Sequence, residues 1–183
     1  MLVNGAGGIT GGLIVQLAAL RGVDVLATAS PRSADRLRTN GAREVIDYRD
    51  PMWPHHARAL AKDSIHAVAN AAPGGAAAAM TALADGGRLA TITPDPPAST
   101  RGISVTAVYV RSDGAQLDRL TALLDSRRLS MPTPRSCSLD QAASALAQVV
   151  AGHQPSGVVV TKDISRSCHH TPKNTSHHQG VSR

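Results

Sequence analysis

Glycines recur at every third position near the start of the chain, in the run GAGGITG that spans residues 5–11. Gly5 lacks a Cβ and can leave a strand in a backbone conformation that other residues avoid. Gly8 would let the backbone lie against a pyrophosphate, and Gly11 would let the following helix pack close to a sheet. The free N–H groups at the start of such a helix attract phosphate. The spacing therefore predicts a dinucleotide-binding turn.

The run is not a strict G-x-G-x-x-G pattern, because Thr10 stands where the last glycine of that pattern would be. A plain structural turn is therefore the alternative interpretation. The context favours dinucleotide binding, since a strand, a turn, an amphipathic helix and a second strand follow one another within about thirty residues.

The end of the expected second strand indicates which dinucleotide would fit. Sites that prefer NAD place an acid there, about twenty residues past the glycines, to hold a ribose hydroxyl. Here the strand runs into Ser30 and Arg32, and the first acid is Asp35 on the following helix. A serine hydroxyl can hydrogen-bond a phosphate and an arginine can pair with it. We therefore expect NADP(H) rather than NAD(H), although Arg32 could also be an ordinary surface arginine.

Strand-like and helix-like segments alternate behind this turn as far as residue 93. Ile9, Leu13, Leu17 and Leu20 recur at helical spacing and predict one apolar face of a helix that ends at Gly22. The other expected helices are 33–40, 54–62 and 74–87, and the expected strands are 23–29, 43–48, 65–71 and 88–93. Such alternation predicts an α/β fold, a doubly wound parallel sheet of Rossmann type with helices on both faces.

The remaining chain divides into an ordered part and a tail. A strand is expected over 103–110, a helix follows around Leu117 to Leu124, and a last strand covers 157–161. The sequence from Ser138 to Gln141 reads as a capping box that opens another helix. Residues 162–183 are almost without apolar side chains and include four histidines, so we expect a disordered tail.

Composition bounds the class of protein. With 183 residues, 42% of them hydrophobic and only 2% aromatic, the chain suits one domain with an aliphatic core. The net charge of +6 contains no basic block, so nucleic-acid binding is disfavoured, although a basic nucleic-acid-binding protein remains a third hypothesis. No run could span a bilayer. Cys137 and Cys168 stand alone, which indicates free thiols and a cytoplasmic location.

Four segments together resemble the medium-chain dehydrogenase/reductase superfamily. They are GAGGITG with VQLAALRG, VLATAS, NGAREVIDYR and LADGGRLATI. The resemblance covers residues 2 to about 161 and is strongest to the quinone oxidoreductase branch related to zeta-crystallin. Enoyl reductase domains of polyketide synthases are close alternatives.

The resemblance implies further residues of the cofactor site. Tyr48 would lie near the adenosine 2′-phosphate. Gly8, Ile9 and Thr10 would line the pyrophosphate. Ala71, Ile92 and Thr93, at the ends of the fourth and fifth strands, would border the cofactor.

The implied reaction is hydride transfer from NADPH to a quinone or an α,β-unsaturated carbonyl. No catalytic residue is assigned, since His66 and the pair His55 and His56 are candidates by residue type alone. No group of metal ligands is expected. Members of this branch often form homodimers through the edge of the nucleotide domain, and the strand 103–110 is the candidate for that role.

The chain departs from the family in one large respect. It has no counterpart of the N-terminal GroES-like substrate domain, and its first strand looks truncated. We therefore expect an NADP-binding domain over 1–161, in which 139–161 would normally join the absent domain. The chain then resembles a fragment whose own activity is in question. The alternative function is a non-catalytic NADPH-binding module that acts through a partner.

Overall fold

The computed structural model describes residues 1–62, 64–151 and 157–162. Among these residues the chain forms two compact units, of which the first is Met1–Thr133 and the second starts at Pro134. The expected disordered tail lies, apart from Lys162, outside the described residues. No helix in the described part of the chain is long and apolar enough to cross a membrane.

The first unit is built on a six-stranded sheet in which every pairing is parallel, with the strand order β3-β2-β1-β4-β5-β6. The strands are β1 (Leu2–Asn4), β2 (Leu26–Ala29), β3 (Glu44–Asp47), β4 (Ala67–Asn70), β5 (Arg88–Thr91) and β6 (Ser104–Ala107). This is the usual order of a Rossmann fold, so the predicted doubly wound sheet is confirmed.

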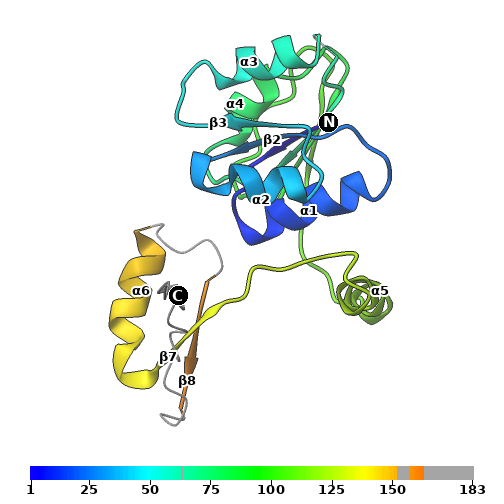
Figure 1. Cartoon of the computed structure of the whole chain (residues 1–183). Helices are drawn as coiled ribbons and strands as arrows, with labels where there is room; N and C mark the ends of the chain where they lie inside the picture. Colours follow the sequence, from blue (N-terminus) through cyan, green and yellow to red (C-terminus); the bar gives the residue numbers. More distant parts are fainter. Residues whose placement is uncertain (63, 152–156, 163–183) are drawn as a thin grey trace, which may run out of the picture. The chain divides into compact units, whose positions relative to one another are not determined.

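Helices cover both faces of this sheet (Figure 1). Successive side chains of a strand point to opposite faces, so Leu2 belongs to one apolar cluster and Val3 to the other. The cluster around Val3 includes residues of α1 (Ile9–Ala19) and α2 (Ala34–Thr39). The cluster around Leu2 includes residues of α3 (Trp53–Leu60) and α4 (Ala76–Thr81).

Helix α1 forms where the sequence predicted it, but the predicted apolar face is wrong. Ile9 and Leu20 are exposed, whereas Val15 and Ala18 are buried together with Gly11, Gly12 and Gln16. Small residues on the buried face bring the helix close to the sheet, which the larger leucines would prevent. The spacing of apolar residues therefore located the helix without indicating which side it buries.

The strand β1 has only three residues and still occupies the centre of the sheet. It pairs with β2 on one side and β4 on the other, and both Leu2 and Val3 are fully buried. Because it is central, its last residue lies between the ends of two other strands, and Gly5 follows directly.

Helix α5 (Gly114–Asp125) is the last helix of the first unit along the chain, and none of its residues is buried. The Asp113 side chain caps it by accepting from the Gln116 N–H at 2.9 Å.

The second unit contains the parallel pair β7 (Arg135–Ser138) and β8 (Val158–Thr161) with α6 (Ala142–Val150) between them in the chain. The strand β7 was not predicted. The expected capping box is wrong, because Ser138 ends β7 and its side chain makes no capping hydrogen bond. A short 3-10 turn over Leu139–Gln141 follows instead, and the α-helix begins only at Ala142.

Candidate dinucleotide-binding site

The residues predicted to bind a cofactor gather at one edge of the sheet. Each follows the end of a parallel strand, and parallel strands end at the same edge. Gly5, Gly8, Ile9, Thr10 and Gly11 follow β1, Ser30 and Arg32 follow β2, Tyr48 follows β3, Ala71 follows β4, and Ile92 and Thr93 follow β5. The Ala71 N–H donates to the Asn4 carbonyl at 2.8 Å, and the Ile92 N–H donates to the Asn70 carbonyl at 3.1 Å, so neighbouring loops are tied together.

The glycine turn has the geometry that its spacing suggested. Gly5 has φ +80°, a left-handed conformation that side chains rarely adopt. A Cβ on Gly11 would lie 2.3 Å from the Gly5 carbonyl oxygen, so α1 packs on the turn only because residue 11 is glycine. A Cβ on Gly8 would meet nothing nearer than the Gly5 oxygen at 3.7 Å, so the space beside Gly8 is open.

The N-terminus of α1 faces this open space without a cap. Gly8 is the N-cap residue, there is no side-chain cap, and the first turn holds no acidic residue. Among the described residues, no acceptor binds the N–H groups of Ile9, Thr10 or Gly11. Unpaired N–H groups and the positive end of the helix dipole favour an anion. A glycine cradle with free donors therefore fits the pyrophosphate of a dinucleotide.

The residues proposed for the adenosine side are accessible. Ser30 is half-buried at the start of a 3-10 turn, Arg32 is exposed, and Tyr48 is 54% exposed. The Arg32 guanidinium makes no hydrogen bond or ion pair with another described residue. Its five N–H donors are thus available to a ligand.

Next to Tyr48 lies an ion pair that sequence reasoning did not consider. The Arg49 guanidinium donates to both Asp47 carboxylate oxygens, with a shortest distance of 2.7 Å, and the Arg49 N–H adds a bond of 3.1 Å. The side-chain hydrogen bond from Arg49, followed by its backbone N–H, holds the pKa of Asp47 below its ordinary value.

Arg36 is a second residue that the sequence did not single out. It lies on α2, is half-buried, and its Nη2 donates to the Gly7 carbonyl at 2.8 Å. Its Nη1 would lie 3.1 Å from a Cβ placed on Gly12. Arg36 therefore reaches the glycine turn, whereas Arg32, the arginine chosen from the sequence, has no contact of this kind. From the sequence, only the place of Arg36 on a helix expected to pack beside α1 could have indicated this contact.

The three candidate histidines make no hydrogen bond to the glycine turn in the described part of the chain. His66 precedes β4 and is therefore at the amino edge of the sheet. His55 and His56 are exposed on α3, and the His56 Nδ1 lies 3.4 Å from an Asp50 carboxylate oxygen.

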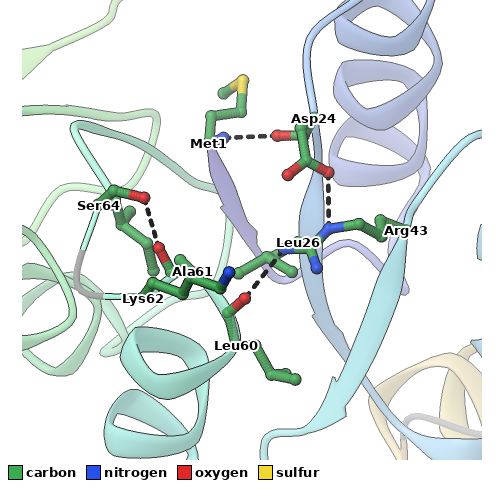
Figure 2. A pocket seen from close by; sticks show the side chains of 9 residues that line it. Met1, Asp24, Leu26, Arg43, Leu60, Ala61, Lys62 and Ser64 are labelled. Carbon is green, nitrogen blue, oxygen red and sulfur yellow. Dashed lines mark hydrogen bonds and ion pairs between the residues drawn. The ribbon is translucent and has the colours of Figure 1, made fainter.

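A pocket of about 300 Å³ opens at the same amino edge, opposite the glycine turn (Figure 2). Several of its polar groups are hydrogen-bonded to one another. The Met1 ammonium donates to the Asp24 carbonyl at 2.6 Å, and Arg43 donates to the Asp24 carboxylate at 2.8 Å and to the Leu60 carbonyl at 3.2 Å. Burial lowers the pKa of the Met1 ammonium, and the nearby Asp24 opposes that change. This pocket is separate from the predicted site.

Comparisons with known proteins agree with this geometry. A family model described as zinc-binding dehydrogenase matches residues 40–160. The chain belongs to the zinc-binding dehydrogenase family. The predicted membership of the medium-chain dehydrogenase/reductase superfamily is thereby confirmed, with quinone oxidoreductases among the relatives.

Two relatives and one solved structure illustrate the match. A trans-enoyl reductase of Alternaria alternata is 36% identical over 111 residues, which cover 59% of this chain and 32% of that protein. A chloroplastic quinone oxidoreductase of Triphysaria versicolor is 28% identical over 171 residues, 87% of this chain and 51% of that protein. A mycobacterial protein solved with NADPH superposes with a TM-score of 0.73 at 22% identity, over 87% of this chain and 55% of that one. The chain thus spans about half the length of these last two proteins, and less of the first.

The described part of the chain contains no group of side chains that could bind the zinc after which the family is named. No three His, Cys, Asp or Glu side chains gather there in a way that could hold a metal ion. Zinc therefore enters none of the steps proposed below.

Proposed function

We propose that this chain binds NADP(H) at the carboxyl edge of its six-stranded sheet and serves an oxidoreductase of the quinone or enone reductase type. The observation that carries this proposal is the uncapped start of α1 beside the open space at Gly8. Free N–H donors at a helix N-terminus, reached by a turn that only glycine can make, bind a pyrophosphate in many nucleotide folds.

The bound NADPH would supply the hydride, and the acceptor would be a quinone or an α,β-unsaturated carbonyl. The residues of this chain would bind and orient the cofactor. The N–H groups of Ile9 and Thr10 would hold the pyrophosphate. Ala71, Ile92 and Thr93 would border the other half of the dinucleotide, so that one face of its ring stays open to substrate.

A non-catalytic NADPH-binding module acting through a partner is the second candidate. It is favoured by the candidate histidines, since His66 lies at the amino edge and neither His55 nor His56 hydrogen-bonds to the glycine turn in the described part of the chain. Oxidation of NADPH by a quinone distinguishes the two functions. Turnover supports the oxidoreductase, whereas binding without turnover supports the module.

The preference for NADP(H) rests on Ser30 and Arg32, because the end of β2 carries no acid. Calorimetric titration of the whole chain with NADPH and then NADH tests it. We expect tighter binding of NADPH, and we expect Arg32→Met to weaken NADPH about tenfold while leaving NADH unchanged. Arg38→Met is the matched control, since Arg38 is exposed on α2 and pairs with Asp35 instead. A folded chain that binds neither nucleotide would refute the proposal.

We also propose that two copies of the chain associate and that the protein works in the cytoplasm. The association is proposed through β6, an edge strand that pairs only with β5 among the described strands. Unpaired strand edges are common sites for pairing with another chain. Beyond β6, Val108, Tyr109 and Val110 expose their side chains.

A further inference from the structure

A row of buried polar side chains crosses the sheet just beneath the glycine turn. Four of its members lie at or next to the last residues of β1, β2, β4 and β5, and the fifth lies two residues after β5. They are Asn4, Thr28, Asn70, Thr91 and Thr93, none more than 8% exposed. Buried polar groups are costly unless they are hydrogen-bonded, so a row of five requires an explanation.

From Thr28 through Asn4 and Asn70 to Thr91, each member of the row donates to the next, and the Thr91 and Thr93 hydroxyls share a further hydrogen bond of 2.7 Å. The Gly5 N–H donates to the Thr28 hydroxyl at 3.0 Å, and that hydroxyl donates to Asn4 Oδ1 at 2.6 Å. Asn4 Nδ2 donates to Asn70 Oδ1 at 2.8 Å. Asn70 Nδ2 then donates to the hydroxyls of Thr91 at 2.9 Å and Thr93 at 3.1 Å.

The row also holds the loops above it. Asn4 Nδ2 donates to the Gly75 carbonyl at 3.2 Å, and Asn70 Nδ2 donates to the Ala72 carbonyl at 3.2 Å. A Cβ on Gly5 would lie 2.8 Å from the Ala72 nitrogen, so the glycine turn touches the loop after β4. The row therefore spans from the turn after β1 to the loops after β4 and β5.

The two carboxamides give the row its order. An Asn amide has an acceptor on one side and donors on the other, so Asn4 accepts from Thr28 and donates to Asn70. Every buried side-chain nitrogen and oxygen in the described residues has a partner. A fully satisfied network of this kind resists local rearrangement, because shifting one member leaves the next unpaired.

We propose that this row is a positioning network, which holds the glycine turn at a fixed distance from the loops after β4 and β5. An extended dinucleotide can then reach both at once. The inference rests on the proposed function and goes beyond it, because Thr28 and Thr91 are fully buried and act only through other residues. According to this proposal, the two threonines affect the affinity for the whole dinucleotide, but they do not affect the affinity for a ligand that carries its adenosine half alone.

The test compares two probes, NADPH and adenosine 2′,5′-bisphosphate, by calorimetry on the whole chain. Thr91→Val keeps the shape of the side chain and removes the hydroxyl, whereas Thr91→Ser keeps the hydroxyl. We expect Thr91→Val to weaken NADPH about five- to tenfold, the usual effect of one lost buried hydrogen bond. The affinity for the bisphosphate should change by less than about twofold. The separate variant Thr91→Ser should bind NADPH as tightly as the wild type does.

Controls separate positioning from a general loss of stability. Ile65→Val shortens a buried side chain of the apolar core, at the amino edge of the sheet, and should leave both affinities unchanged. Thr28→Val, at the other end of the row and likewise fully buried, is the second variant if Thr91→Val does not fold, and the same pattern is expected of it. Circular dichroism verifies folding at the temperature of the titrations.

The outcomes are distinct. Selective weakening of NADPH with rescue by serine supports the network. Equal weakening of both probes, or of neither, overturns it while leaving the proposed function intact. Failure of the folded wild-type chain to bind either probe overturns the proposed function and the network together.

Discussion

At the scale of single residues, Gly11 is the position where the turn tolerates least change. A Cβ there would lie 2.3 Å from the Gly5 oxygen and 2.8 Å from the Ala6 Cα, both backbone atoms that cannot rotate away. We expect Gly11→Ala to cost about 1–3 kcal/mol of unfolding free energy and to abolish tight NADPH binding. Urea denaturation and calorimetry measure the two effects. Gly114→Ala is the control, since a Cβ at Gly114 meets nothing within 4 Å; equal effects at both positions would contradict the argument.

Arg36 leads to a prediction of a different kind. Its guanidinium holds the Gly7 carbonyl, which belongs to the part of the turn shared by every dinucleotide. Arg36→Met keeps the aliphatic stem and removes the donors, so the affinities for NADPH and NADH should both fall about tenfold or more, because a hydrogen bond to a charged group is worth about 1.5–3 kcal/mol. Loss of NADPH binding alone would instead place Arg36 on the 2′-phosphate. Titration of the variant with both nucleotides decides between these results.

Asp47 carries a prediction about pH. Its pKa is held below the ordinary value of 3.8 chiefly by the Arg49 side chain. A depressed pKa in the folded state means that the interaction stabilises the fold above pH 3.8 and that this contribution is lost as the pH falls through the lower folded pKa. Arg49→Gln should raise the pKa of the Asp47 carboxyl toward 3.8, as followed by NMR titration of the side-chain carbon. Arg38→Gln should leave it unchanged.

At the scale of helices and strands, much of the first unit could be predicted from the sequence. Strands such as Leu26–Ala29 and the glycine turn follow from local patterns that do not depend on distant contacts. The buried face of α1 could not be predicted in this way, because small residues such as Ala18 decide it only once the sheet is present. The contact of Arg36 with the glycine turn and the row of buried polar side chains were missed for the same reason. The hydrogen-bond partners of Arg36 and Asn4 are more than twenty residues away in the chain.

The edge strand β6 makes the proposed association testable. The Ser104 N–H donates to the carbonyl of Gly87, just before β5, and the Val108 N–H donates to the carbonyl of Thr91 at its end, so by alternation the Ala107 N–H points to the free edge. Ala107→Pro removes that donor and should keep the ladder to β5, because proline is tolerated on the open side of an edge strand. We expect a shift from dimer to monomer in light scattering after gel filtration. Ala107→Ser retains the N–H and should behave as the wild type; a wild type that is monomeric at every concentration would refute the association.

At the scale of the whole molecule, binding should be visible as stability of the first unit. The sequence has one tryptophan, and Trp53 is buried in the apolar cluster between the sheet and helices α3 and α4, so its fluorescence reports unfolding of this unit. A ligand that binds only the folded state raises the unfolding free energy by about 2.7 kcal/mol at a hundred times its dissociation constant. We expect NADP⁺, which does not absorb the emission of tryptophan, to raise the urea midpoint accordingly. In Gly11→Ala the same concentration should have no effect, because the cradle for the pyrophosphate is displaced. If NADP⁺ shifts both proteins equally, it binds somewhere other than the glycine turn, and the site described here is wrong.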